Sequence, residues 1–294
     1  MPCPTDALRA LGRAQEARMP IAQALALGVL HGPAELLPVS SSGHVSALPW
    51  LLGWRYSELG DEARKSFEVA LHAGSAAAWL LLPSASTGRP PTPRAPRELL
   101  LLALAAAPAG VVGLVFERPI ERRLGTPGLI AVGLALGGAV MAAADRAPDA
   151  RAAEEAEPVD AAWLGLAQAT ALLPGVSRTG ATLAAARLRG FSAQAAWRLS
   201  TQTATPVIGG AAALKLARLL SRRPTGRQAA GLLSGAGASF GSTVVAARIL
   251  RPLERGWPLR PFAAYRMALA LALATRLRSA RRGSRARPLH TAQV

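Results

Sequence analysis

The sequence predicts an all-α integral membrane protein, built as an inverted-topology repeat of about six transmembrane helices plus two re-entrant helix hairpins. The 294-residue chain is 51% hydrophobic and has a mean hydropathy of +0.25, which is too apolar for an ordinary soluble domain. Its apolar residues gather in long runs, and two of these runs are broken near the middle by Pro, Gly and Ser. We expect a single polytopic membrane domain over 1–294.

The charge of the chain favours a lipid surface as its partner. There are 34 Lys and Arg against 17 Asp and Glu, a formal net charge of +17. Much of this charge lies in short connectors and in a basic C-terminal tail, 279–294, where it can meet anionic headgroups. An aromatic content of 4% and the absence of a nucleic-acid recognition motif argue against nucleic acid. The N-terminal stretch lacks the apolar core of a signal peptide, so we expect insertion to depend on the mature spans.

Six apolar runs are long enough to cross a bilayer as helices. A helix rises ~1.5 Å per residue and the hydrocarbon core is ~30 Å thick, so about 20 apolar residues are needed. The runs lie at about 66–83, 98–116, 127–144, 197–219, 228–250 and 261–278.

Two further apolar stretches predict re-entrant hairpins. Residues 21–52 are interrupted at "LLPVSSSGH", and residues 161–190 are interrupted at "LLPGVSRTGA". Each half is too short to cross the bilayer alone, and broken backbone at membrane depth is tolerated where it lines a cavity.

The order of these segments indicates two repeats, about 21–144 and about 160–278. Each begins with a hairpin containing Leu-Leu-Pro and continues with three spans. Three crossings reverse the side from which the second unit enters, so the two breaks are expected to meet near the midplane, where such repeats place a substrate site. The alternative is two coincidental Leu-Leu-Pro tripeptides in a Leu-rich chain.

The second break, "PGVSRTGAT", has the composition of an oxyanion site. A guanidinium fork, hydroxyl groups, unobstructed glycine N–H groups and a helix N-terminus all suit phosphate oxygens. The alternative is that the arginine side chain extends to the lipid headgroups and that the hydroxyl groups donate hydrogen bonds to backbone carbonyls of their own helix. The candidate substrate-binding residues are Gly175, Ser177, Arg178, Thr179, Gly180 and Thr182.

The first break carries the parts of a hydrolytic site. Glu35 offers a carboxylate, His44 an imidazole and Ser41 a hydroxyl that an adjacent base can turn into a nucleophile. The alternative is that the serines permit close helix packing and that His44 is hydrogen-bonded across an interface. Ser40 and Ser42 fit that alternative equally well. Together, the two breaks predict a phosphorylated substrate with an apolar tail, presented from the lipid phase.

Four motifs, "ELLPVSSSGH", "FEVALHAG", "PGVSRTGAT" and "RPFAAYR", resemble the bacterial undecaprenyl-diphosphatase family, also known for bacitracin resistance. The resemblance runs from about Ile21 to the last span. It implies the inverted repeat, a location in the bacterial inner cell membrane, and hydrolysis of undecaprenyl diphosphate to the monophosphate. This reaction recycles the lipid carrier of peptidoglycan synthesis with the help of Mg²⁺ or Ca²⁺, and homodimer formation is left open.

By the same resemblance, Glu35 falls on a metal-binding or acid/base glutamate. Ser41 and His44 fall on the proposed nucleophile and its base, and Arg178 falls on the diphosphate-binding arginine. Ser177 and Thr182 fall on supporting hydroxyl positions. Catalysis is thereby expected from Glu35, Ser41, His44 and Arg178.

The chain departs from the family pattern at two histidines. His31 stands where family members usually have Glu or Gln, and His72 stands where they usually have Gln. We further expect Pro33 to interrupt the helix that would place His31 and Glu35 on one face. With His31 and Glu35 as the metal residues, imidazole favours Zn²⁺ or Mn²⁺ over Mg²⁺. The alternative is no metal, with a protonated His31 binding phosphate directly.

Two other functions stay open at this point. An inverted repeat with broken helices is equally the pattern of a polyprenyl-phosphate transporter or flippase. The substitution at His31 also fits a catalytically silent paralogue. The distribution of Arg places the N-terminus, the loops 117–126 and 217–227 and the C-terminal tail in the cytoplasm.

Overall fold

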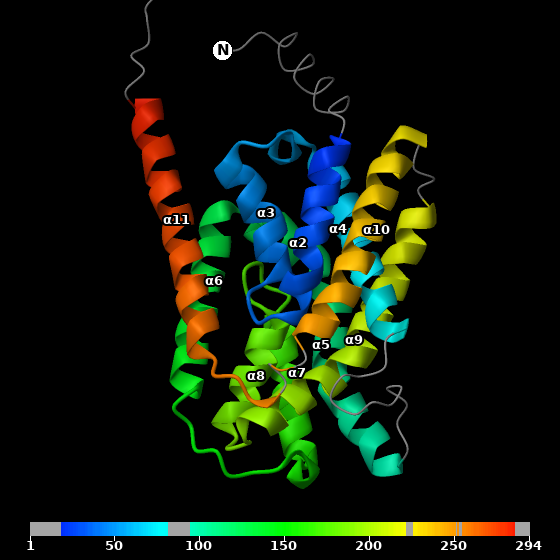
Figure 1. Cartoon of the computed structure of the whole chain (residues 1–294), viewed down its shortest axis with the longest axis vertical. Coiled ribbons are helices and arrows are strands. Elements are labelled where there is room, and N and C mark those ends of the chain that lie inside the picture. The colour runs from blue at the N-terminus through cyan, green and yellow to red at the C-terminus, as the bar shows by residue number, and fades with distance from the viewer. Residues whose placement is uncertain (1–18, 82–94, 222–225, 251, 253–254, 286–294) are drawn as a thin grey trace, which may run out of the picture.

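The computed structural model describes residues 19–81, 95–221, 226–250, 252 and 255–285. Over these ranges it contains ten α-helices and two short 3-10 helices. Within the described residues, helices occupy all six sequence-predicted spans and all four hairpin halves, apart from a residue or two at their ends (Figure 1). The elements are α2 (Ile21–Leu36), α3 (Ser41–Leu52), η1 (Arg55–Glu58), α4 (Asp61–Leu81), α5 (Pro96–Leu124), α6 (Pro127–Ala144), η2 (Ala153–Glu155), α7 (Pro158–Thr170), α8 (Arg178–Leu188), α9 (Ala193–Ser221), α10 (Gly226–Ile249) and α11 (Arg260–Arg285).

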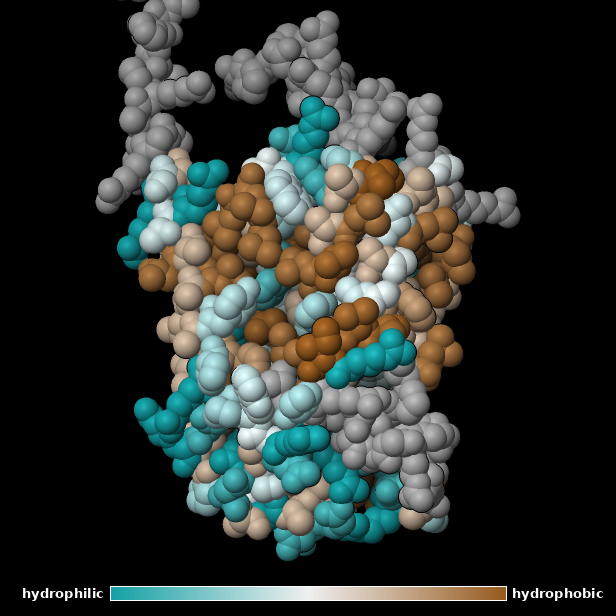
Figure 2. All heavy atoms as spheres, in the orientation of Figure 1, coloured by the Kyte–Doolittle hydropathy of each residue, from teal (hydrophilic) through white to brown (hydrophobic). Residues whose placement is uncertain are grey.

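Three of the described helices are long and apolar enough on their own to cross a membrane: Pro96–Phe116, Pro127–Ala144 and Gln228–Ile249. Many of their large apolar side chains are exposed, among them Leu114, Leu136 and Leu233. Hydrophobic residues gather over the middle and upper part of the face shown in Figure 2, and hydrophilic residues gather at its lower end. Such a surface suits hydrocarbon, because lipid rather than other protein can cover these side chains.

A pair of helices occupies each of the two broken stretches, called here the first and second hairpin, and the two pairs enter the structure from opposite ends. In Figure 1, α2 and α3 come from the upper end, whereas α7 and α8 come from the lower end. The second helix of each hairpin begins with a serine cap. Ser40 Oγ accepts a hydrogen bond from Gly43 N at 3.3 Å, and Ser177 Oγ accepts one from Gly180 N at 3.1 Å. Each cap satisfies an N–H group that the helix leaves unpaired at its start.

The expectation that Pro33 interrupts the first helix is wrong. Helix α2 continues through Pro33 to Leu36, and Leu37 N closes it on Pro33 O at 2.9 Å. A proline ring removes a single intrahelical hydrogen bond, and here it does so within the last turn. His31 and Glu35 therefore remain four residues apart on one continuous helix and share a face.

Helix α10 packs along both α2 and α4, and glycines make the contact close. A Cβ at Gly32 would meet Ser242 and the backbone N of Thr243 on α10. The backbones of α2 and α10 can therefore approach closely. This approach brings Ser239 of α10 beside His31, where its Oγ lies 3.1 Å from Nδ1 of the imidazole.

Arg266 of α11 ties the two hairpin breaks together. Its side chain is 1% exposed, and its guanidinium donates to the carbonyl oxygens of Pro38 at 3.3 Å and Gly175 at 3.0 Å. It also donates to Gly133 and Leu134 of α6, at 3.2 and 3.3 Å. The four bonds satisfy the buried cation, and two of them reach carbonyl groups in the breaks, at Pro38 and Gly175.

Candidate active site

Glu35 joins the two breaks. Its side chain is 13% exposed and lies near the end of α2. Ser41 Oγ donates a hydrogen bond to Glu35 Oε2 at 2.6 Å, and Arg178 Nη2 donates to Glu35 Oε1 at 3.3 Å. Three residues that were predicted from two separate motifs therefore meet around one carboxylate.

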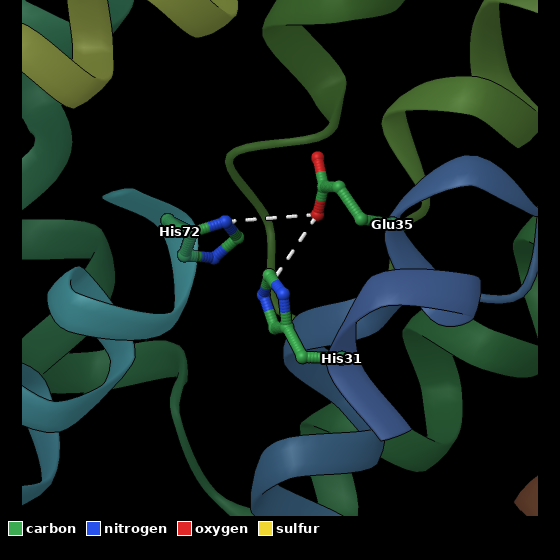
Figure 3. A group of neighbouring side chains, drawn as sticks. All are labelled: His31, Glu35 and His72. Carbon is green, nitrogen blue, oxygen red and sulfur yellow. Dashed lines mark ion pairs between the residues drawn. The ribbon is translucent and has the colours of Figure 1, made fainter. Parts of the chain in front are cut away.

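Two histidines approach the same carboxylate from the other side. His31 Nε2 lies 4.0 Å from Glu35 Oε2, and His72 Nδ1 of α4 lies 3.6 Å from it (Figure 3). The two imidazole rings meet edge to face, with centroids 4.6 Å apart. One ligand atom from each of the three residues lies within 4.8 Å of the others, a spacing that could hold a metal ion.

Arg178 is held at the start of α8. Its guanidinium lies 5.9 Å from the centroid of the Trp79 ring, within the range of a cation–π contact. The neighbouring Thr179 Oγ1 donates to the backbone carbonyl of Glu35 at 3.4 Å. The arginine side chain is 14% exposed, so its charge is screened less by water than that of a surface arginine.

The structure gives His44 other partners than Ser41. Its Nδ1 lies 2.7 Å from the carbonyl oxygen of Ser40, and its Nε2 lies 2.6 Å from the hydroxyl of Tyr265. Because a carbonyl can only accept, Nδ1 carries the hydrogen, and in the neutral ring Nε2 accepts from Tyr265. Both ring nitrogens are thereby engaged, and the base role predicted for His44 toward Ser41 finds no hydrogen bond in this geometry.

The remaining residues of the predicted cradle have mostly structural contacts. Ser177 caps α8 through the N–H of Gly180, so that N–H is already paired. Thr182 is fully buried, and its hydroxyl donates to the helix or meets Ser200 Oγ of α9 at 2.6 Å. Gly175 has φ +88 and offers its carbonyl to Arg266. Their substrate-binding roles stay predictions, and their observed contacts shape the break that presents Arg178.

Sequence reasoning missed four contributors to this site: His72 as a neighbour of Glu35, Trp79 beside Arg178, and Tyr265 and Arg266 from "RPFAAYR". The last motif carried a signal, since an arginine and a tyrosine inside an apolar helix are costly without buried partners. The partner of Tyr265 is His44 and a partner of Arg266 is Pro38, and each lies more than 200 residues away in the sequence. Only the folded chain reveals them.

A protein family matches most of this sequence. The family described as bacitracin resistance protein BacA matches residues 24–272. This chain belongs to the BacA family. The resemblance seen in the four motifs is confirmed, and the family membership together with the three apolar helices makes the chain a membrane protein.

Several curated relatives carry the name undecaprenyl-diphosphatase. One from Geobacter sulfurreducens is 35% identical over 265 residues, which cover 85% of this chain and 95% of the relative. One from Pelotomaculum thermopropionicum is 39% identical over 207 residues, covering 67% of this chain and 76% of the relative. One from Moorella thermoacetica is 34% identical, covering 86% of this chain and 96% of the relative.

The residues around Glu35 do not fit the Mg²⁺ or Ca²⁺ that the family resemblance implies. Those hard cations prefer oxygen ligands, which for Mg²⁺ include waters and substrate phosphates beside one or two carboxylates. The cluster in this BacA member offers two imidazoles and a single carboxylate. Two of the three candidate ligand atoms are thus imidazole nitrogens, and only one is a carboxylate oxygen.

Proposed function

We propose that this BacA member hydrolyses undecaprenyl diphosphate to undecaprenyl phosphate and inorganic phosphate in the bacterial inner membrane. Family membership and the names of the relatives support this activity. The observation that carries it is the double hydrogen bonding of Glu35, which joins a serine hydroxyl to a phosphate-binding arginine. Regeneration of the lipid carrier would supply cell-wall synthesis and give resistance to bacitracin.

Binding of the diphosphate falls to Arg178. A guanidinium presents a planar fork of donors that matches two phosphate oxygens, and the start of α8 adds a partial positive charge. The guanidinium donates a hydrogen bond to Glu35. An incoming phosphate competes for this arginine and leaves Glu35 beside Ser41, so substrate binding also prepares the base.

Glu35 then takes the proton of Ser41. The bond from Ser41 Oγ to the terminal phosphorus forms as the bond from that phosphorus to the bridging oxygen breaks, and undecaprenyl phosphate leaves with the electron pair. Water next attacks the phosphoserine, the phosphorus–Oγ bond breaks, and the proton held by Glu35 returns to Oγ. The hydrogens of the water leave with the phosphate. Arg178 stabilises the charge on the transferred group in both steps.

In this proposal His44 positions rather than activates the serine. Its ring links Ser40 O to Tyr265, and Ser40 holds a φ of +75 that is unusual for a residue with a Cβ. Fixing this strained turn sets the direction in which the next residue, Ser41, projects toward Glu35.

We propose that the two hairpins and the helices after them form the inverted repeat expected from the sequence. Their entry from opposite ends and the meeting of Glu35 with Arg178 support this topology. The beginning of α2, the end of α9, the beginning of α10 and the end of α11 share the upper end in Figure 1. We assign that end to the cytoplasm because the basic loops belong to it.

Phosphate release tests the activity. Detergent-solubilised full-length protein is supplied with undecaprenyl diphosphate, and wild type is compared with Ser41→Ala and with the neighbouring control Ser42→Ala. We expect release by wild type and Ser42→Ala and its loss in Ser41→Ala with lipid binding retained. Binding without release in the wild type would instead identify a carrier or a silent paralogue.

Single-cysteine labelling tests the topology. The chain has one cysteine, Cys3, so Cys3→Ser provides a cysteine-free background. On it, Ser221→Cys puts an exposed thiol at the last residue of α9, which ends at the upper end in Figure 1. Ala150→Cys puts one in the connection from α6 to η2, which lies at the lower end. An impermeant maleimide applied to spheroplasts should label Ala150→Cys at once and Ser221→Cys only after permeabilisation. Labelling of both from the same side would rule out the assigned topology.

A further inference from the structure

His31 has a nitrogen lone pair that no described group uses. Ser239 Oγ donates its single hydrogen to the carbonyl of Leu71 at 2.9 Å, so toward His31 Nδ1, at 3.1 Å, it can only accept. Nδ1 therefore carries the imidazole hydrogen, and Nε2 of the neutral ring carries the lone pair. That atom is buried, and it has no hydrogen-bond partner among the described residues.

The lone pair of His31 faces another acceptor. Nε2 lies 4.0 Å from Glu35 Oε2, and the carboxylate brings negative charge to the same space (Figure 3). Two acceptors this close repel each other, and Nε2 of His31 has no described partner that replaces the hydration lost on burial. A cation between them would remove both costs.

His72 completes the set from a different helix. Its Nδ1 lies 3.6 Å from the same oxygen of Glu35, and its side chain is 35% exposed. The chain thus brings two imidazoles and one carboxylate from α2 and α4 together, and His72 is the most exposed of the three. The hydroxyl of Ser41, bonded to the same carboxylate oxygen, lies beside this cluster.

We propose that His31, Glu35 and His72 form a binding site for a divalent transition ion of the Zn²⁺, Fe²⁺ or Co²⁺ type, in place of Mg²⁺ or Ca²⁺. Imidazole suits these borderline ions, and two His with one carboxylate is an established ligand set for them. Ser239 fixes the ring of His31 through the nitrogen opposite to the ligand atom, as the outer partners of metal-bound histidines do.

Metal binding by the full-length protein in detergent tests the site without reference to activity. Residual metal is removed with a chelator, and Co²⁺ is added while its visible absorption is recorded, because four-coordinate Co²⁺ has an intense spectrum. The fourth histidine of the chain, His290, lies outside the described residues and is removed by His290→Ala in every protein tested. We expect one ion per chain, displaced by Zn²⁺ but retained in a large excess of Mg²⁺.

Three variants locate the ion. His72→Gln keeps a polar side chain of similar size and should abolish the Co²⁺ spectrum or weaken binding strongly. Ser239→Ala should weaken binding by about 10- to 100-fold, as expected for loss of an outer partner. His44→Gln, which changes the one described histidine outside the cluster, should bind Co²⁺ like the parent protein. Thermal melting without metal confirms that each variant is folded.

Three results would overturn the proposal: no Co²⁺ bound by the folded parent protein, displacement of Co²⁺ by Mg²⁺ or Ca²⁺, or a His72→Gln protein that binds as well as the parent. Each is separate from the activity. A protein that binds Co²⁺ but releases no phosphate would keep the metal site and reject the phosphatase function, and the reverse result would do the opposite.

Discussion

The hydroxyl of Tyr265 lies 2.6 Å from Nε2 of His44, and the two rings are nearly parallel, with centroids 5.5 Å apart. Tyr265 lies on α11 and His44 on α3. The contact therefore anchors the first turn of α3, which carries Ser41, to the last described helix of the chain.

Replacement of Tyr265 by Phe should slow the reaction modestly. The variant keeps the stacked ring and loses one hydrogen bond to His44, worth about 1 kcal/mol or roughly a fivefold effect. We expect this loss in kcat with little change in KM, because Tyr265 positions the serine turn and does not contact the phosphate. Tyr56→Phe, a change of the other tyrosine, is the control. An equal fall in rate in both variants would remove the positioning role.

Replacement of Glu35 by Gln should cost more activity than any change at His44. An amide cannot take the proton of Ser41, and general-base catalysis contributes about 10²- to 10⁴-fold. Phosphate release by Glu35→Gln is compared with that of His44→Gln and of the exposed control Glu58→Gln. If His44→Gln is the slower of the two site variants, His44 rather than Glu35 is the base.

Arg178→Lys should lose most activity despite keeping its charge. A point ammonium cannot reproduce a two-pronged contact with phosphate oxygens. Loss of one charge-assisted hydrogen bond costs about 1.5 to 3 kcal/mol, roughly ten- to a hundredfold in rate. Arg198→Lys, a matched change at a partly exposed arginine that pairs with Glu154, should be nearly neutral. Wild-type turnover by Arg178→Lys would show that the phosphate is bound elsewhere.

The helices and the main catalytic candidates could be predicted from the sequence because their signals are local. Apolar runs mark the spans, and the Pro, Gly and Ser clusters mark the breaks. Glu35, Ser41 and Arg178 are polar groups inside these breaks, where burial is costly without a function. Of the long helices, α4, α9 and α11 are not apolar enough on their own to qualify as spans.

What the sequence could not supply were partners brought together by packing. The roles of Tyr265 and Arg266 depend on α11 lying beside both breaks, and that of His72 depends on α4 lying beside α2. The expectation that Pro33 interrupts α2 was wrong because the rule that proline breaks helices was applied without regard to where Pro33 lies in the helix. A proline in the last turn leaves few hydrogen bonds to break.

The second break should be intolerant of a side chain at Gly175. This residue has φ +88, and a Cβ would meet the carbonyl oxygen of Ile130 on α6. Gly175→Ala should lower the melting temperature and the activity together, because the loop that presents Arg178 must shift. Gly110→Ala has open space around the new Cβ and should stabilise α5 by about 0.5 to 1 kcal/mol. Equal melting temperatures for the two variants would contradict the close approach of the loop to α6.

The sharpest prediction concerns His31. His31→Glu adds a second carboxylate beside Glu35, and oxygen ligands with negative charge favour hard cations. Activity of the variant should therefore depend more steeply on Mg²⁺ than that of the wild type, and its Co²⁺ affinity should fall.

The opposite outcome is equally specific. If His31 only links α2 to Ser239 of α10, the substitution breaks that bond and buries an unpaired carboxylate, which mainly lowers stability. Phosphate release against Mg²⁺ concentration is measured together with the melting temperature of both proteins. A lowered melting temperature with an unchanged metal response would assign His31 to packing and leave Glu35, Ser41 and Arg178 as the site.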